Sequence, residues 1–444
     1  MKRKLICLIL VTILLCSLFS MNVMGKTVLF SNEDGVTIFY EDFEDYEMPA
    51  DLINNLMGYW RFEDDSALGS GHNEFNIIET EDGTQALYAH WIHGRLMKSD
   101  TDLIVKSPFV LGGRIMAQGD TATNHGTFIW IRSSKTPLVS QNGRLLNEYE
   151  EDIDKEVGGT GLALELYSNK IDVIIREWSE ETEDGLFSNR TPIDLPEGVD
   201  LTNNFVDFLV EDDGNVIKVT FDNTLLCTIE YSEPKEGYYS KAVVKDAEGN
   251  VLNESEVATL CADDEAAIAF ANRAGIFTID EVYYIGNAAA GKNVYANKKT
   301  YTTEDDIEIG YLGAEENYWI GVYKKGTTPS NENQPIKRVD VVGMGAELLK
   351  AVDLTLEPGE YDIVLFENNE YKEVSKITVT VEEPPTPEPT DEPADETPAP
   401  SSPSDEDEDD KEGGNTLVYI LVAVGVVVIA AVVVALSVIK KKKK

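Results

Sequence analysis

Four tryptophans with polar neighbours are the residues of this sequence best suited to bind a small ligand. Flat aromatic rings stack on the faces of sugars, while nearby polar and charged groups form hydrogen bonds with the sugar hydroxyls. Arg61, His90, Arg132 and Arg176 stand beside these rings in the sequence. Aromatic residues in strands also serve as core residues, so the hypothesis needs at least one exposed ring. The candidate carbohydrate-binding residues are Trp60, Trp91, Trp130, Trp178 and Arg132.

The histidines and cysteines give less support to a site. His90 and His93 would point to opposite faces of a strand, so they cannot share a transition metal there. Beyond the N-terminal segment the chain keeps Cys227 and Cys261. These two residues can form one disulfide in an oxidising compartment or remain two buried thiols. We expect no metal site at the histidine pair.

The charge of the chain limits its partners. With 37 basic and 81 acidic residues, its net charge is −44. Such a surface repels nucleic-acid backbones and anionic lipid headgroups, so we expect neither nucleic-acid binding nor peripheral membrane binding. It suits a hydrated surface protein, or one that meets divalent cations.

The two ends of the chain predict export and membrane anchoring. Residues 1–25 combine a basic start with an apolar run, the pattern of a cleaved signal peptide. Residues 416–439 carry no charge and are long enough, at about 1.5 Å per residue, to cross about 30 Å of hydrocarbon. The lysines at 440–444 stay cytoplasmic. We therefore expect a single-pass plasma membrane protein with its N-terminus and ectodomain extracellular and its C-terminus cytoplasmic.

Residues 382–415, between the ectodomain and the predicted span, are rich in Pro, Glu, Asp, Thr and Ser. Few apolar groups and much like charge leave little to offset the entropy of ordering, so we expect a disordered, extended stalk. Such a stalk can carry the ectodomain through a thick layer such as a Gram-positive cell wall.

The ectodomain alternates apolar and polar residues with a period of two. Leu162–Leu166 and Ile217–Phe221 are examples, and turn pairs such as Asp213-Gly214 separate the runs. Many short strands of this kind predict an all-β fold, here an antiparallel jelly-roll sandwich. A small, polar segment near residue 290 marks a boundary. We therefore expect a jelly-roll domain over 26–287 and a smaller immunoglobulin-like β-sandwich over 292–381.

Residues at both ends of the larger domain indicate a family. The sequence reads FYEDFEDY at 39–46 and GIFTIDEVYYI at 275–285, with a hairpin at 211–226. This layout resembles the concanavalin A-like or laminin G-like jelly roll of lectins, carbohydrate-binding modules and laminarinase-type glycosidases, over about residues 36–286. The resemblance implies two antiparallel sheets with the terminal strands paired near each other.

The smaller domain has a pattern of its own. It reads YWIGVY at 318–323 and LEPGEYD at 356–362. This pattern is similar to the "WIGxY" immunoglobulin-like accessory domains of bacterial extracellular proteins and to SKICH-type domains. The resemblance implies that Trp319 is a core residue and Tyr361 a corner residue.

The jelly-roll resemblance also implies one structural calcium ion. In such modules a first-strand glutamate and a last-strand aspartate help to hold it, and the matching residues here are Glu44 and Asp280. Oxygen ligands from distant segments suit calcium, which tolerates irregular geometry. In so acidic a chain, the two can equally be solvated residues of edge strands.

No catalytic motif stands out. Laminarinase-type enzymes carry Glu-x-Asp-x-Glu or Glu-x-Asp-x-x-Glu on one strand, and the nearest segment here, Glu150–Glu156, fits neither spacing. We therefore expect no enzyme, but a non-catalytic cell-surface display protein that binds an extracellular or wall glycan in the manner of a lectin. The alternatives are a diverged jelly-roll glycosidase or lyase, and a structural module that adheres to a surface protein.

Overall fold

The computed structural model describes residues 28–44, 46, 56–57, 60–64, 74–90, 92–95, 105–118, 127–133, 160–179, 186–263, 266–272, 276–289 and 291–385. The predicted signal peptide, membrane span and lysine tail lie outside these residues, as does the predicted stalk beyond Pro385. Within the described residues, no helix is both long enough and apolar enough to cross a membrane. The predictions for both chain ends stay predictions.

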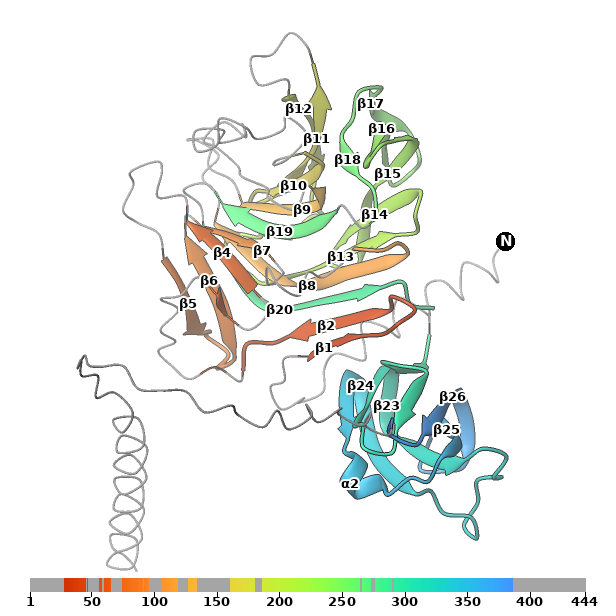
Figure 1. The fold of residues 1–444 in the computed structure, drawn as a ribbon. Helices are drawn as coiled ribbons and strands as arrows, with labels where there is room; N and C mark the ends of the chain where they lie inside the picture. The colour runs from red at the N-terminus through yellow and green to blue at the C-terminus, as the bar shows by residue number, and fades with distance from the viewer. Residues whose placement is uncertain are drawn as a thin grey trace, which may run out of the picture. The chain divides into compact units, whose positions relative to one another are not determined.

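In the described residues, sheet A has twelve strands, and its neighbouring strands are antiparallel. Several of them are labelled in Figure 1. Its main order is β1 (Val28–Ser31), β2 (Thr37–Glu41), β20 (Ile276–Gly286), β8 (Phe109–Gln118), β13 (Val206–Asp212), β14 (Val216–Phe221), β15 (Thr224–Lys235), β16 (Tyr238–Asp246) and β17 (Val251–Ser255). The branches are β6 (Gln85–His90) on β20, β5 (Glu74–Glu79) on β6, and β18 (Leu260–Cys261) on β16. The early strand β2 lies beside the late strand β20, as the resemblance implies.

Sheet B has eight strands within the part of the chain that the structure describes. Their order is β12 (Leu186–Asp194), β11 (Lys170–Trp178), β10 (Leu162–Leu166), β9 (Thr127–Ser133), β19 (Ala267–Asn272), β7 (Ile92–Arg95), β4 (Trp60–Asp64) and β3 (Leu56–Met57). His90 ends a strand of sheet A, whereas His93 lies in a strand of sheet B.

The core lies between sheets A and B because every second residue of their strands faces inward. In β14 the buried residues are Ile217, Val219 and Phe221, and they share one apolar cluster with leucines of β10. Figure 1 shows β9 and β19 above β8 and β20, and the rings of Phe270 and Phe277 lie 6.4 Å apart across this gap. The predicted all-β sandwich is therefore confirmed.

Strands β9 and β10, and all but the ends of β11, are buried on both faces. Their inward residues join the main core, while a second cluster covers the opposite side of sheet B. The second cluster consists of Phe128, Trp130, Ala163, Ile174 and Ala269. We call this side the outward face of sheet B.

Sheet C uses residues 293–382 alone and has six strands. Its order is β21 (Asn293–Ala296), β23 (Ile307–Lys324), β25 (Gly359–Glu367), β26 (Lys372–Glu382) and β22 (Thr300–Thr302), with β24 (Lys337–Leu349) on β23. A single turn of helix, α2 (Ala351–Leu354), follows β24. Both Trp319 and Tyr361 are buried, and the Tyr361 hydroxyl donates to the Glu357 carbonyl over 2.8 Å.

The two cysteines are free and buried. Cys227 lies opposite Asp246 and Cys261 opposite Tyr238, at the two ends of β16. At about 3.4 Å per residue along that strand, they are much too far apart for a disulfide, which needs Cα atoms within about 7 Å. Of the two alternatives for this pair, the structure shows buried thiols.

Candidate functional site

The outward face of sheet B carries charged side chains next to aromatic ones. Residues of β9 to β12 that alternate with core residues point to this face. Strand register places them in two rows across the sheet. One row holds Phe128, Glu165, Asp172 and Pro192, and the next holds Trp130, Ala163, Ile174 and Arg190.

Two carboxylates in the first row meet the same arginine. The Nη1 atom of Arg190 contacts Glu165 Oε2 and lies 3.7 Å from Asp172 Oδ2. Asp172 also pairs with Lys170, whose Nζ lies 2.7 Å from Oδ1. Glu165 and Asp172 are buried, whereas the Arg190 side chain is 37% exposed. Buried carboxylates require such partners, and burial lowers the pKa of Arg190.

Arg176 lies beside this group on β11. Its guanidinium carbon lies 5.9 Å from the centre of the Trp130 ring, and its Nη1 donates to Ser188 Oγ over 2.8 Å. Trp130 is buried, and its Nε1 has no hydrogen-bond partner in the described part of the chain. Two residues farther along β11, Trp178 is 36% exposed. Among the described residues of this face, Trp178, Arg190 and Pro192 are exposed and Ser188 is partly exposed.

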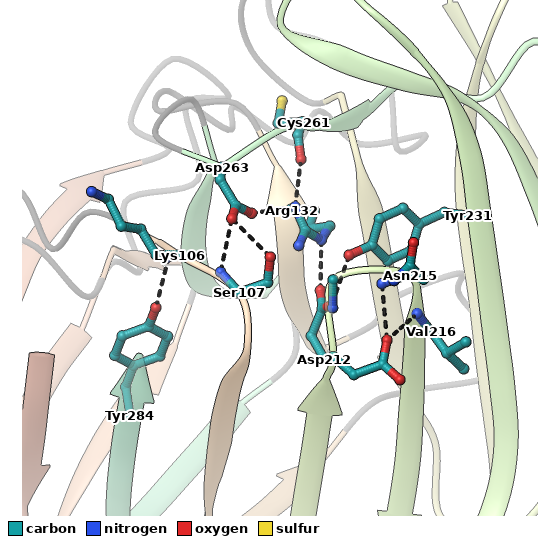
Figure 2. Close-up of polar contacts among 12 residues, drawn as sticks. Lys106, Ser107, Arg132, Asp212, Asn215, Val216, Tyr231, Cys261, Asp263 and Tyr284 are labelled. Carbon is teal, nitrogen blue, oxygen red and sulfur yellow. Dashed lines mark hydrogen bonds and ion pairs between the residues drawn. The ribbon is translucent and has the colours of Figure 1, made fainter. Parts of the chain in front are cut away.

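Arg132 occupies a different place, in the interior between the sheets (Figure 2). Its Nε donates to Asp212 Oδ2 over 2.6 Å, and its Nη1 donates to Asp263 Oδ1 over 3.0 Å and to the Cys261 carbonyl over 3.1 Å. Arg132 belongs to sheet B and Asp212 to sheet A. The ion pair therefore joins the two sheets.

Other polar groups fix the two aspartates. Asp212 Oδ1 accepts hydrogen bonds from the Tyr231 hydroxyl, at 2.7 Å, and from the Gly214 amide, at 2.9 Å. Asp263 Oδ2 accepts from both the amide and the hydroxyl of Ser107, at 2.9 and 2.7 Å (Figure 2). We call these residues, with Arg132, the Arg132 cluster.

Charge balance keeps the buried guanidinium ionised. Burial is the largest single influence and opposes the charge of Arg132, but the charge and hydrogen bond of Asp212, together with Tyr231 and Asp263, raise the pKa of Arg132. The Tyr231 ring lies 4.6 Å from the guanidinium carbon and adds a cation–π contact. The side chain of Arg132 is 0% exposed, so it has no surface on which a ligand could rest.

The two predicted calcium ligands contact adjacent residues where β6 begins. Glu44 Oε1 accepts from the Gln85 amide over 2.7 Å, and Asp280 Oδ1 accepts from Thr84 Oγ1 over 3.0 Å. Asp280 also forms an ion pair with Arg114. Burial raises the pKa of Asp280, and the charge of Glu44 acts in the same direction. No group of three or more metal-ligating side chains occurs among the described residues, and the calcium site stays a prediction.

The tryptophan predictions have separate outcomes. The side chain of Trp60, in β4, and the whole of Trp91 lie outside what the structure describes. Trp130 and Trp178 do share the outward face of sheet B, one buried and one accessible. Glu165, Asp172 and Arg190 were not among the site residues predicted from the sequence. For Glu165 and Asp172 the signal is an acidic residue at an alternate position of a largely apolar strand; Arg190 lies in a mixed strand and has no such signal.

No family model and no curated protein matches this chain. Solved structures match part of it. A glycoside hydrolase family 16 endo-glucanase from Bacteroides ovatus has 9% identity and a TM-score of 0.33, with 55% of this chain and 99% of that chain covered. For an endo-β-1,3-glucanase from Pyrococcus furiosus the values are 14%, 0.29, 60% and 100%. For the carbohydrate recognition domain of Emp47p they are 12%, 0.24, 54% and 95%.

Identities under 25% and TM-scores under 0.5 assign neither a family nor a substrate to this chain. The predicted jelly roll is established only as the all-β sandwich that the strand pairing shows. The matched structures include enzymes, which contradicts the prediction that the chain is not an enzyme, and we withdraw that prediction. No match supports the immunoglobulin-like interpretation of residues 292–381, which stays a prediction.

Proposed function

We propose that the outward face of sheet B binds a carbohydrate chain. The observation that carries the proposal is the meeting of Arg190 with Glu165 and Asp172 on the face that also holds the accessible Trp178 ring. The exposed guanidinium of Arg190 donates hydrogen bonds, which the hydroxyl oxygens of a sugar can accept. An exposed indole provides the flat surface on which a sugar ring stacks.

The approach of the ligand follows from exposure. Trp178 and Arg190 are accessible and Ser188 is partly exposed, whereas Glu165 and Trp130 are buried. A ligand would therefore meet the edge of the face along β11 and β12 first. The buried carboxylates hold Arg190 in place for this contact.

Binding is tested with the full chain on an array of glycans and by titration with those that bind. Trp178→Ala and Arg190→Gln should each weaken binding by about tenfold or less, since one aromatic contact contributes about 0.5–1.5 kcal/mol. Phe187→Ala is the matched control. Phe187 is also an exposed ring on β12, 37% accessible, but it pairs with Glu177 and so points away from this face. Unchanged binding in both site variants would refute the proposal, and adhesion to a surface protein would take its place.

A second candidate function is glycoside hydrolysis by the same face. Glu165 and Asp172 are directly opposite on adjacent strands and contact one guanidinium nitrogen. Retaining glycosidases place their two carboxyl groups about 5–5.5 Å apart, and neighbouring strand positions allow that spacing. If the pair is catalytic, the full chain will release reducing ends from a polysaccharide, and Glu165→Gln and Asp172→Asn will abolish this release. Equal release by both variants and the wild type would exclude the pair.

We also propose that the protein is displayed at the cell surface, with its β-sheets on the extracellular side. The proposal rests on the uncharged residues 416–439 and the lysines that follow them. Protease added to intact cells should remove most of the chain, while protection of residues 28–385 would contradict this orientation.

A further inference from the structure

Sheet A carries an open groove of about 620 Å³ on the side that faces away from the core. Its floor belongs to β5, β8 and β20, where Ile78, Met116 and Thr278 alternate with residues of the main core. Its rim comes from the turn after β5 and from the segment before β13. The residues that line it include Thr80, Asp82, Arg114, Asn203, Asn204 and Phe205. We call it the sheet A groove.

Arg114 is held in a fixed orientation at this groove. Its Nη1 pairs with Asp280, its Nε lies 3.6 Å from Asp207 Oδ1, and its guanidinium carbon lies 5.5 Å from the centre of the Phe205 ring. More than a third of the side chain remains exposed. A guanidinium placed in this way can donate to a ligand without a large loss of side-chain entropy, because its partners already order it.

The local backbone explains how Arg114 reaches this position. The register of β8 and β20 shifts between Ile279 and Glu281, so Asp280 lies in a bulge. At Gly113 a Cβ atom would lie 2.1 Å from the Glu281 carbonyl oxygen. Only glycine allows the two strands to approach this closely next to the bulge.

The opposite rim supplies acceptors. Asp82 accepts hydrogen bonds from the hydroxyls of Thr80 and Thr84, the latter over 3.2 Å. The bond from Thr80 lowers the pKa of Asp82, so this carboxylate is ionised at neutral pH. Asn203 and Asn204 are exposed and add amide groups that donate as well as accept.

These groups select a type of ligand. The acidic rim, which includes Glu79 and Glu81, repels anions. The single arginine has two aspartates as partners, so it offers hydrogen bonds rather than net positive charge. Because β8 and β20 are paired on both sides, these two strands offer no free edge to a peptide. The volume lies within the range of about 300–1,000 Å³ that is usual for ligand sites.

We propose that the sheet A groove binds a neutral, polyhydroxylated chain, namely an uncharged oligosaccharide, at a second site of this domain. The proposal is independent of the one for sheet B, since the two sites share no residue. Two sites on opposite outer faces of one sandwich allow the domain to hold two chain segments at once. When one site has bound a polymeric glycan, the effective concentration of that glycan at the other site is raised, so the overall affinity increases without any new contact.

The test is titration calorimetry of the full chain with hexasaccharides of a β-1,3-glucan, a β-1,4-glucan and a mannan, with oligogalacturonate as the anionic probe. Asn204→Trp places a large ring at an exposed rim position and should block the groove without unfolding the domain. Arg114→Gln should remove the donor. Each is expected to weaken binding of a neutral hexasaccharide at this site at least tenfold, and oligogalacturonate should not bind there.

Glu236→Trp is the matched control because it adds a ring at an exposed residue between β15 and β16, away from the groove. Trp178→Ala separates the two sites, since it should leave the groove unchanged. Wild-type affinity in both Asn204→Trp and Arg114→Gln would overturn the proposal. Failure of the wild type to bind any neutral hexasaccharide would overturn it too.

Discussion

Arg132 and Arg114 have the same kinds of partners in two different places. Each guanidinium contacts two aspartates and lies near an aromatic ring. The Arg132 side chain is 0% exposed and bridges the two sheets, whereas that of Arg114 is 36% exposed and lines a groove. The same combination of an arginine, two aspartates and an aromatic ring is thus a structural centre where it is buried and a candidate ligand site where it is exposed to solvent.

The difference lies in how far water reaches each guanidinium. In the interior, a guanidinium that loses its carboxylate partners stays charged, and no water is present to take their place. At the groove, water already contacts part of the side chain, and a ligand can replace that water. Burial of the arginine therefore distinguishes the two roles better than its list of contacts does.

Arg132→Met gives the largest expected effect. It leaves Asp212 buried without its partner, which should lower the free energy of unfolding by about 3–5 kcal/mol, measured by urea denaturation of the full chain. Arg114→Met should cost about 1 kcal/mol, because solvent screens a partly exposed pair. Lys245→Met, which removes a surface pair with Glu230, is the control. Equal decreases in the free energy of unfolding for Arg132→Met and Arg114→Met would contradict this comparison.

The pH dependence of stability tests the groove side of the comparison. Burial raises the pKa of Glu281 from 4.5 to about 7, and the charge of Asp280 acts in the same direction. Between these pH values the folded chain holds a proton that the unfolded chain has lost, so stability falls as pH rises. The expected fall is about 3 kcal/mol, at about 1.36 kcal/mol per pKa unit.

Glu281→Gln should remove this fall in denaturation curves recorded from pH 4.5 to 7. Glu230→Gln changes a surface glutamate and should leave the fall in place. A pH dependence that survives in Glu281→Gln would show that another group is responsible.

Gly113→Ala tests whether the bulge beside Arg114 needs glycine. The added methyl group would meet the Glu281 carbonyl oxygen, and overpacking of this kind costs about 1–3 kcal/mol. Gly249→Ala is the control, because Gly249 also has a positive φ, of 88°, but has no atom within 4 Å of the added Cβ. The difference between their urea midpoints isolates the steric cost, and equal midpoints would contradict it.

The smallest effect is expected from the cysteines. Burial raises the pKa of Cys227 to about 12, so its thiol is protonated and unreactive at neutral pH. A reductant should leave the melting temperature unchanged, and thiol reagents should label Cys227 and Cys261 only after unfolding. A lower melting temperature in reductant would indicate a disulfide instead.

Strands were the predictable part of this chain. Alternation alone identified Leu162–Leu166 and Ile217–Phe221, which the structure has as β10 and β14. Alternation could not predict which strands pair. A period of two shows which residues of a strand share a face, but it does not show which strands are neighbours. The resemblance supplied one such fact, the proximity of the first and last strands.

The site was harder to predict, and Arg132 shows why. It stands two residues after Trp130, so a regular strand would place both on the outward face. Its φ of 47° instead breaks the alternation, and its side chain reaches Asp212 of the other sheet. Glu165 and Asp172 gave the opposite difficulty, since two acids seven positions apart become partners only through the register of β10 and β11.

Sheet C ends in a way that affects how the protein bears load. Strand β26 lies between β25, which is antiparallel to it, and β22, which is parallel. Hydrogen bonds of an antiparallel ladder run across the strands, so a force directed along β26 loads its bonds to β25 together. A force along β26 from the C-terminal side is therefore shared between two neighbouring strands, β25 and β22.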